Sequence, residues 1–253
     1  MIKFFRKIRQ QLLTENKISK YLLYAIGEIL LVMIGILLAL QVNNLNENRK
    51  KRTLEIQILK ELKQGFETDL TDIQSNLKLY NSSQESISII IDYFKNGEPY
   101  HDTLSHNFAQ AAAPVLFVSD DTGYEFMKTI GASTISNNYL RKEIVRIHDI
   151  SYENIKSWEN VGMFLDHQYR ANQFLKHFDK IEGWIVDSTG NWVPGRMVPR
   201  DYGSLRQDQE FMATLRTIST SIDALKLIEY DSIETRLVNV IKSISDEIIL
   251  LES

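Results

Sequence analysis

The chain has 253 residues, no cysteine, a formal net charge of −4 and 43% hydrophobic residues. These values exclude a collagen-like chain, a small disulfide-stapled domain and a largely disordered chain. The charge is uneven: the first twenty residues carry six Lys or Arg and one Glu, so they are +5 and everything after them sums to −9. An acidic remainder of this kind argues against nucleic acid as a partner.

Residues 1–17 are predicted to form a basic amphipathic tail in the cytoplasm. Within IKFFRKIRQQLL, residues 2–13, the apolar side chains fall on one helical face and the basic side chains on much of the rest. Such a segment can lie in the lipid headgroup layer, where each basic residue contributes about 1 kcal/mol of attraction to anionic lipid. The alternative is that the tail serves only as a topology signal.

Residues 18–42 are predicted to form a single transmembrane helix. Residues 21–40 read YLLYAIGEILLVMIGILLAL, with 17 apolar residues of 20 and Glu28 as the only ionisable residue. Twenty helical residues rise about 30 Å, which matches the hydrocarbon core of a bilayer. Leu38 and Leu40 are too large for a signal-peptidase site, so we expect an uncleaved signal anchor.

The flanking charges indicate the orientation. Six Lys or Arg precede the span and four follow it at residues 49–52, so the positive-inside rule favours a cytoplasmic N-terminus by a small margin. A long C-terminal domain can be translocated whatever its charge, and the absence of cysteine fits an oxidising compartment. The C-terminal domain is therefore expected on the far side of the membrane.

Three residues of the span share a stripe on one helical face. Glu28, Gly35 and Ala39 are spaced by seven and four residues. Gly35 and Ala39 form a small-xxx-small pair that lets two helices approach closely, and an intramembrane carboxylate can hydrogen-bond to a partner helix. We expect these residues to pack a homo-oligomer. The alternative is that Glu28 snorkels, or stays protonated, without further consequence.

The first fifty residues resemble a known family. FFRKIRQQLLTENK is followed by YAIGEILLVMIGILLALQVNNLNENRK, so the matching residues run from Phe4 to about Lys51. This string is similar to the signature of a family of uncharacterised single-pass membrane proteins of Gram-negative bacteria, classed as a domain of unknown function. A weaker similarity lies in YEFMKTIGASTISNNYLRKEI, residues 124–144. The resemblance implies a location in the bacterial inner membrane and brings no known activity. With the orientation that the flanking charges favour, the C-terminal domain is expected in the periplasm.

Residues 44–95 are predicted to form one long helix that leaves the membrane directly. Apolar residues recur every seven positions, which makes a continuous seam like that of a coiled coil or a long bundle helix. The first series is Leu59, Phe66, Ile73, Tyr80, Ile87 and Phe94, and the second is Leu70, Leu77, Gln84 and Ile91. The pattern ends at Gly97 and Pro99, which cap and stop a helix. The seam is a second candidate surface for a homo-oligomer.

Shorter elements follow the seam. A helix is expected over residues 102–112 and another over residues 122–130, ended by Gly131. Thr122 and Glu125 have the spacing of a capping box at the start of the second of these helices.

A second long helix is expected over residues 139–181, capped by Ser136 or Asn137. After it, WIVDSTGNWV at residues 184–193 reads as two short strands around a glycine-containing turn, which predicts a small β-hairpin.

The last long helix is expected over residues 205–251. Ser204 and Gln207 form another pair with capping-box spacing. The apolar register slips near Tyr230, which predicts a kink there.

The predicted fold class is therefore mainly α, with residues 43–253 forming an extended antiparallel helical bundle. If residues 44–95 run away from the bilayer and residues 139–181 run back, the segment 183–203 lies near the membrane. The candidate interface or ligand contacts there are Trp184, Trp192, Arg196 and Arg200, since Trp prefers the headgroup layer and Arg can pair with phosphate. The alternative is that the Trp rings merely close the end of the bundle.

The motifs of common catalytic and metal sites do not occur. The histidines lack HExxH spacing, there is no cysteine for a CxxC pair, and GxSxG, GxGxxG and GxxxxGK[ST] are missing. Asp120 and Asp121 are more simply helix-capping groups than an acid–base pair. We expect no metal, no cofactor and no catalytic residue, although enzymatic activity is not excluded.

The sequence favours a membrane-anchored interaction or structural module of the cell envelope. The expected partners are the lipid bilayer, an envelope protein and a second copy of the chain, with no nucleic acid. The alternative is a periplasmic ligand sensor, in which a pocket among residues 100–200 moves the membrane helix. Only twenty residues precede the span, too few for a folded output domain, so a sensor has to act through a partner protein.

Overall fold

The computed structural model describes residues 18–186, 188, 190 and 192–253. The predicted tail, residues 1–17, lies outside the described residues. Contacts divide the chain into two compact units, with the boundary between Leu54 and Glu55. The long helix α2, Ile18–Asn96, contributes its first part to one unit and its remainder to the other.

The first unit contains the apolar part of α2 and the polar residues of this helix up to Leu54. From Ala25 onward it contains a window with a mean hydropathy of 2.4, and none of that window is buried against other described parts of the chain. The leucine and isoleucine side chains described between residues 22 and 45 are 46–77% exposed. This helix, near the N-terminus, is long and apolar enough to cross a membrane. The predicted span is thus helical.

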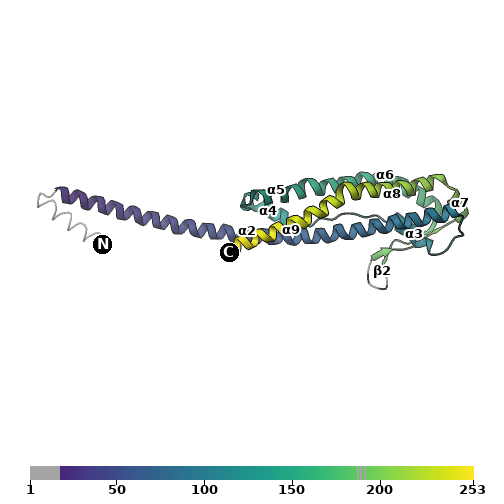
Figure 1. Cartoon of the computed structure of the whole chain (residues 1–253), viewed down its shortest axis with the longest axis horizontal. Helices are drawn as coiled ribbons and strands as arrows, with labels where there is room; N and C mark the ends of the chain where they lie inside the picture. Colours follow the sequence, from purple (N-terminus) through teal and green to yellow (C-terminus); the bar gives the residue numbers. More distant parts are fainter. Residues whose placement is uncertain (1–17, 187, 189, 191) are drawn as a thin grey trace. The chain divides into compact units, whose positions relative to one another are not determined.

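The second unit is a mainly α-helical bundle with two small β-ribbons. Its helices after α2 are α3 Leu104–Ala112, α4 Thr122–Ile130, α5 Asn138–Arg146, α6 Glu153–His177, α7 Tyr202–Gln207, α8 Gln209–Leu225 and α9 Asp231–Glu252 (Figure 1). A 3₁₀ turn, η1 Ala132–Thr134, lies before α5, and two π-helical turns, η2 Ile147–Tyr152 and η3 Lys226–Tyr230, join α5 to α6 and α8 to α9. The predicted fold class, mainly α with a small hairpin, is confirmed.

The predicted apolar seam of α2 lies at the centre of the bundle. All six residues of its first series, from Leu59 to Phe94, are at most 7% exposed. The second series is only half-buried. Its place in the core is taken by the series one position earlier, Glu55, Leu62, Asp69, Asn76, Ser83 and Ile90. Four of these buried residues are polar, and we name Glu55, Asp69, Asn76 and Ser83 the polar stripe.

Residues 113–121, which we name the strap, run back along α2 without forming a helix or a strand. The hydrogen bonds of the polar stripe mark the path of the chain. From Ser83 back to Glu55 along α2, the partner residues advance from Gln110 to Ser136, so this part of the chain runs antiparallel to α2. The pairs are Ser83 with Gln110, Asn76 with Leu116, Asp69 with Asp120 and Glu55 with Ser136, at 2.6 to 3.2 Å. The chain has therefore returned to the level of Glu55 before α5 begins.

The two remaining long helices run in opposite directions (Figure 1). Because the strap has already returned the chain, α5–α6 runs parallel to α2. The pair α8–α9 runs antiparallel to α2, as shown by the hydrogen bonds Gln84 to Asp223, Gln74 to Glu234 and Lys60 to Glu252.

The expectation that the second long helix runs back along the first is therefore wrong. The physical reason is that nine extended residues cover about 30 Å, as far as twenty helical residues. A short irregular segment thus makes the first part of the return pass, and α4 and η1 complete it before Ser136 reaches Glu55. As a consequence, the segment 183–203 lies beside α3, at the end of the second unit that is remote from Glu55.

Two antiparallel ribbons follow α6. The strands β2 Trp184–Val186 and β3 Trp192–Pro194 pair with each other, which confirms the predicted hairpin. The strands β1 Phe178–Ile181 and β4 Met197–Pro199 form the second ribbon. The helix expected to reach residue 181 ends at His177 instead. The Phe178 ring is 2% exposed and packs edge-on against Phe108 of α3 at 4.9 Å, so a non-local contact holds this residue in extended conformation.

The helix caps agree in part with the expectations. Asn137 caps α5 by accepting from Leu140 N at 3.1 Å, and α4 ends before Gly131. The capping box of Thr122 and Glu125 does not form, because the Glu125 carboxylate pairs with Lys128.

The capping box of Ser204 and Gln207 does not form either, because α7 and α8 are capped by Asp201 and Asp208. The kink expected near Tyr230 is a π-helical turn that ends at this residue, and helical structure continues through it.

Candidate functional site

The predicted membrane stripe lies on α2 within the first unit. Apart from the neighbouring turns of its own helix, Gly35 has no described heavy atom within 4 Å of the place where a Cβ would be. Ala39 lines a groove on the helix surface together with Val42 and Asn46, and Glu28 is half-buried. The three residues of the stripe share the helix as their spacing requires, and their packing against a second helix stays a prediction.

The ribbon β2–β3 brings the two predicted tryptophans to one face. Residues opposite each other in an antiparallel pair point to the same side, and the register pairs Trp184 with Pro194 and Val186 with Trp192. We name these four residues the tryptophan face. Trp184 is 38% and Trp192 is 68% exposed. Rings that merely closed the end of the bundle would be covered, so this face is an open apolar surface.

The two predicted arginines do not join the tryptophan face. The Arg196 guanidinium pairs with Asp102 and donates to the Ser105 hydroxyl at 3.0 Å, which ties the ribbons to α3. Arg200 pairs with Asp179 of β1. Both guanidinium groups are therefore engaged by aspartates of the same chain, and they position the ribbons.

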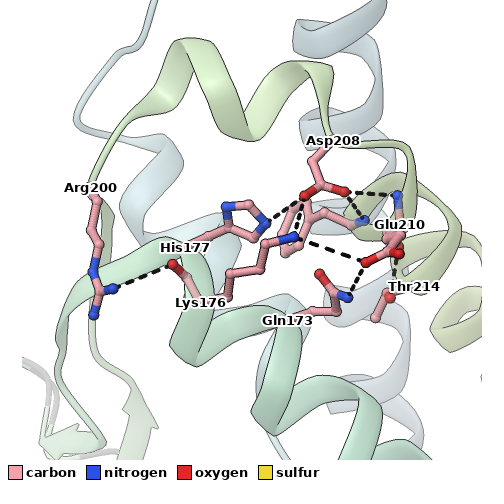
Figure 2. Close-up of polar contacts among 8 residues, drawn as sticks. Gln173, Lys176, His177, Arg200, Asp208, Glu210 and Thr214 are labelled. Atoms are coloured by element: carbon pink, nitrogen blue, oxygen red, sulfur yellow. Dashed lines mark hydrogen bonds and ion pairs between the residues drawn. The ribbon is translucent and has the colours of Figure 1, made fainter.

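A charged cluster around Asp208 joins the end of α6 to the start of α8 (Figure 2). Its Oδ1 accepts from the backbone N–H groups of Glu210 and Phe211 at 2.8 and 3.1 Å, which caps α8. Its Oδ2 lies 2.8 Å from Lys176 Nζ and 3.0 Å from His177 Nε2. The hydrogen bond from Lys176, together with the cap, holds the pKa of Asp208 well below its usual range. The cluster is thus a helix junction.

Asp208→Ala is expected to lower the free energy of unfolding by about 1–2 kcal/mol, because it removes an N-cap. Asp208→Asn keeps an oxygen for the cap and should lower it less. Asp201→Ala, which removes the cap of the shorter helix α7, serves as the matched comparison and should have the smaller effect. Denaturation of the full chain in detergent at neutral pH measures all three, and a wild-type value for Asp208→Ala would contradict the assignment.

The centre of the bundle holds a buried carboxylate that sequence patterns did not single out. Asp69 is fully buried on α2, and Tyr152, the last residue of η2, is fully buried beside it. The Tyr152 hydroxyl donates to Asp69 Oδ2 at 2.6 Å. The backbone N–H of Asp120, in the strap, donates to Asp69 Oδ1 at 2.7 Å. One carboxylate thus holds a π-helical turn and the strap together.

Glu159 on α6 repeats this arrangement. The hydroxyl of Tyr230, the last residue of η3, donates to Glu159 Oε1 at 2.6 Å. The backbone N–H of Phe117, in the strap, donates to Glu159 Oε2 at 3.0 Å. Glu159 is 5% exposed. We name Asp69 and Glu159 the clamp carboxylates.

Burial dominates the electrostatics of the clamp carboxylates. It raises the pKa of Asp69 to about 6 against the hydrogen bonds from Tyr152 and Asp120 N, and the negative charges of Asp120 and Asp121 add to the rise. Burial raises the pKa of Glu159 as well, against its hydrogen bonds from Tyr230 and Phe117 N. Taking an anion out of water disfavours the charged form. Both carboxylates are therefore held at an energetic cost.

His148 in η2 is a third buried titratable group. It is 7% exposed and stacks on Tyr124, with ring centroids 4.1 Å apart and planes inclined by 6°. Its Nδ1 lies 3.4 Å from Asp121 Oδ1. Burial lowers the pKa of His148 to about 4, and the Asp121 carboxylate opposes that shift. The ring is therefore neutral at pH 7.

The polar groups at the centre of the bundle bind other groups of the same chain. Within the described part of the chain, no group of three or more His, Asp or Glu could hold a metal ion. Each clamp carboxylate uses both oxygens on donors of the chain itself, which suits a clamp better than an acid or base. The signal that could have found it is the seven-residue spacing of the polar stripe, since polar residues in phase with a helix core need internal partners.

A family model described as "Family of unknown function (DUF6090)" matches this chain. The match covers residues 28–147. It includes α2 from Glu28, the strap and α5, and it ends before Tyr152, Glu159 and both ribbons. Over this range the chain is similar to an uncharacterised domain family. No curated protein and no solved structure matches the chain.

Proposed function

We propose that the protein is a membrane-anchored helical interaction module of the bacterial cell envelope. Residues 18–42 cross the inner membrane, residues 1–17 lie in the cytoplasm and residues 43–253 lie in the periplasm. The uncovered apolar surface of α2 supports the anchor. The +5 charge of the first twenty residues supports the orientation.

The tryptophan face is the observation that carries the interaction role. Two tryptophans, a valine and a proline share one side of a ribbon, and Trp192 is 68% exposed. Tryptophan is enriched where proteins bind one another, because it buries a large apolar area with few rotatable bonds. By contrast, the clamp carboxylates and both arginines are occupied within the chain. An envelope protein that covers the tryptophan face is therefore the proposed partner.

A second copy of the chain is a further proposed partner, and the bilayer itself is the third. The apolar seam from Leu59 to Phe94 packs inside the chain, so the homo-oligomer rests on the stripe of Glu28, Gly35 and Ala39. A periplasmic ligand sensor acting through a partner is the weaker alternative, because Arg196 and Arg200 are engaged by aspartates instead of converging on an open site.

Photo-crosslinking in intact cells tests the interaction role. A photoreactive amino acid at position 192 of the full chain is expected to capture a distinct envelope protein, and Trp184→Ala should abolish the capture while the chain stays folded by circular dichroism. The same amino acid at position 158 is the matched control, because Trp158 is 48% exposed on α6, away from the ribbons. Equal capture from both positions, or capture that survives Trp184→Ala, would contradict the proposal.

A further inference from the structure

The strap is held by side chains of two helices, without strand pairing. Its backbone N–H groups at Phe117, Val118 and Asp120 donate to carboxylates, at 3.0, 3.3 and 2.7 Å. The acceptors are Glu159 on α6, and Asp72 and Asp69 on α2. Val115 and Phe117 point inward, whereas Leu116 and Val118 are 49% and 70% exposed. One side of the strap is thus open to solvent.

The clamp carboxylates extend these contacts to both π-helical turns. A continuous chain of hydrogen bonds runs from Tyr152 of η2 through Asp69 to the strap, and from the strap through Glu159 to Tyr230 of η3. The Phe117 ring also packs against the Tyr152 ring, with centroids 4.8 Å apart. Each tyrosine and the strap share one buried carboxylate, so the loss of either donor leaves that anion under-compensated and makes its buried position less favourable, which loosens the site that also holds the other donor.

We propose that the strap is the element that couples the two π-helical turns: while it is seated, both turns are held, and when it leaves, both loosen together. A π-helical turn is a rare departure within an α-helix and is frequently found at functional sites. Here the two turns lie in the two helical arms that pack along α2, and the strap bridges them. This device is independent of the partner proposed above.

Single hydroxyl deletions test the coupling. In the full chain in detergent, Tyr230→Phe is expected to speed amide hydrogen exchange roughly fivefold or more in η2 as well as in η3. Because coupling is reciprocal, Tyr152→Phe should likewise speed exchange in η3 as well as in η2. Tyr139→Phe is the matched control, because Tyr139 is 77% exposed on α5. Faster exchange confined to the mutated turn would overturn the proposal.

A disulfide staple tests whether the strap carries the coupling. A Cβ on Gly65 would lie 4.0 Å from Asp120 Cβ, within the range of disulfides. The chain has no cysteine, so Gly65→Cys with Asp120→Cys supplies one defined pair. When the staple is oxidised, Tyr230→Phe should no longer speed exchange in η2, and reduction should restore the effect. An effect on η2 that is the same in both redox states would show that direct helix contacts carry the coupling and would overturn the proposal. If the pair does not crosslink, the hydroxyl deletions decide alone.

Discussion

His148→Phe is expected to make the bundle more stable than wild type by roughly 3 kcal/mol at pH 4, with little change at pH 7. The pKa of His148 is about 4 in the folded protein, against an ordinary value of 6.5. As the pH falls through this window, the unfolded chain takes up a proton that folded His148 does not, so the wild type loses stability. Phenylalanine keeps an aromatic ring against Tyr124 and does not titrate.

Asp69→Asn is expected to change the pH dependence of stability in the opposite direction. The pKa of Asp69 rises from 3.8 to about 6 on folding, so the wild type gains stability as the pH falls from 6 to 4. The variant lacks this gain. The stability of Asp69→Asn relative to wild type should therefore be about 2.4 kcal/mol more favourable at pH 7 than at pH 4, in addition to any pH-independent loss from the altered hydrogen bonds.

Urea denaturation of the full chain in detergent, followed by circular dichroism between pH 4 and 7, measures both variants against wild type. Taking the difference cancels the titration of groups that are distant from the mutated site. In the wild type the two contributions oppose each other over this window. Parallel pH profiles for wild type and His148→Phe would contradict the burial of a neutral histidine.

Gly123→Ala is expected to lower the free energy of unfolding by about 2–3 kcal/mol. A Cβ on Gly123 would lie 2.7 Å from Leu62 N and 2.8 Å from the carbonyl carbon of Glu61. These are backbone atoms of α2, which cannot rotate away as a side chain can. Alanine favours helix over glycine by up to about 1 kcal/mol, so the clash between α4 and α2 has to outweigh this gain.

Gly183→Ala is the matched control, because a Cβ there meets nothing within 4 Å among the described residues. It should change the stability by less than about 0.5 kcal/mol. Thermal and urea denaturation compare the two variants. A neutral Gly123→Ala would mean that α4 does not pack directly on the backbone of α2.

Much of the helical architecture could be predicted from local signals. The seven-residue series from Leu59 predicts the buried face of α2, because a helix places such residues on one side. Asn137 caps α5, and the strands β2 and β3 pair with each other, because capping and the pairing of strands close in sequence depend on a few neighbouring residues. Only the first of the two apolar series is fully buried, since the core also accepts Asp69 and Asn76.

The candidate site was predicted less completely. The hairpin was expected, but only the strand register shows that Trp184 and Trp192 share one face. Arg196 and Arg200 form ion pairs with Asp102 and Asp179 and do not join that face. The clamp carboxylates were missed. Their backbone partners in the strap are 51 and 42 residues away along the chain. A local sequence pattern does not predict which backbone N–H groups will need a buried acceptor.

The sequence alone determined the apolar helix, the charge asymmetry around it and the mainly helical class, because these depend on composition and on periodicity along one stretch of chain. Only the tertiary structure decided the direction of α5–α6, the second ribbon and the clamp. The physical reason is the strap. An extended segment covers a long helix in few residues, and its backbone groups must find partners on whichever helices enclose it, so its course is set by contacts between distant parts of the chain.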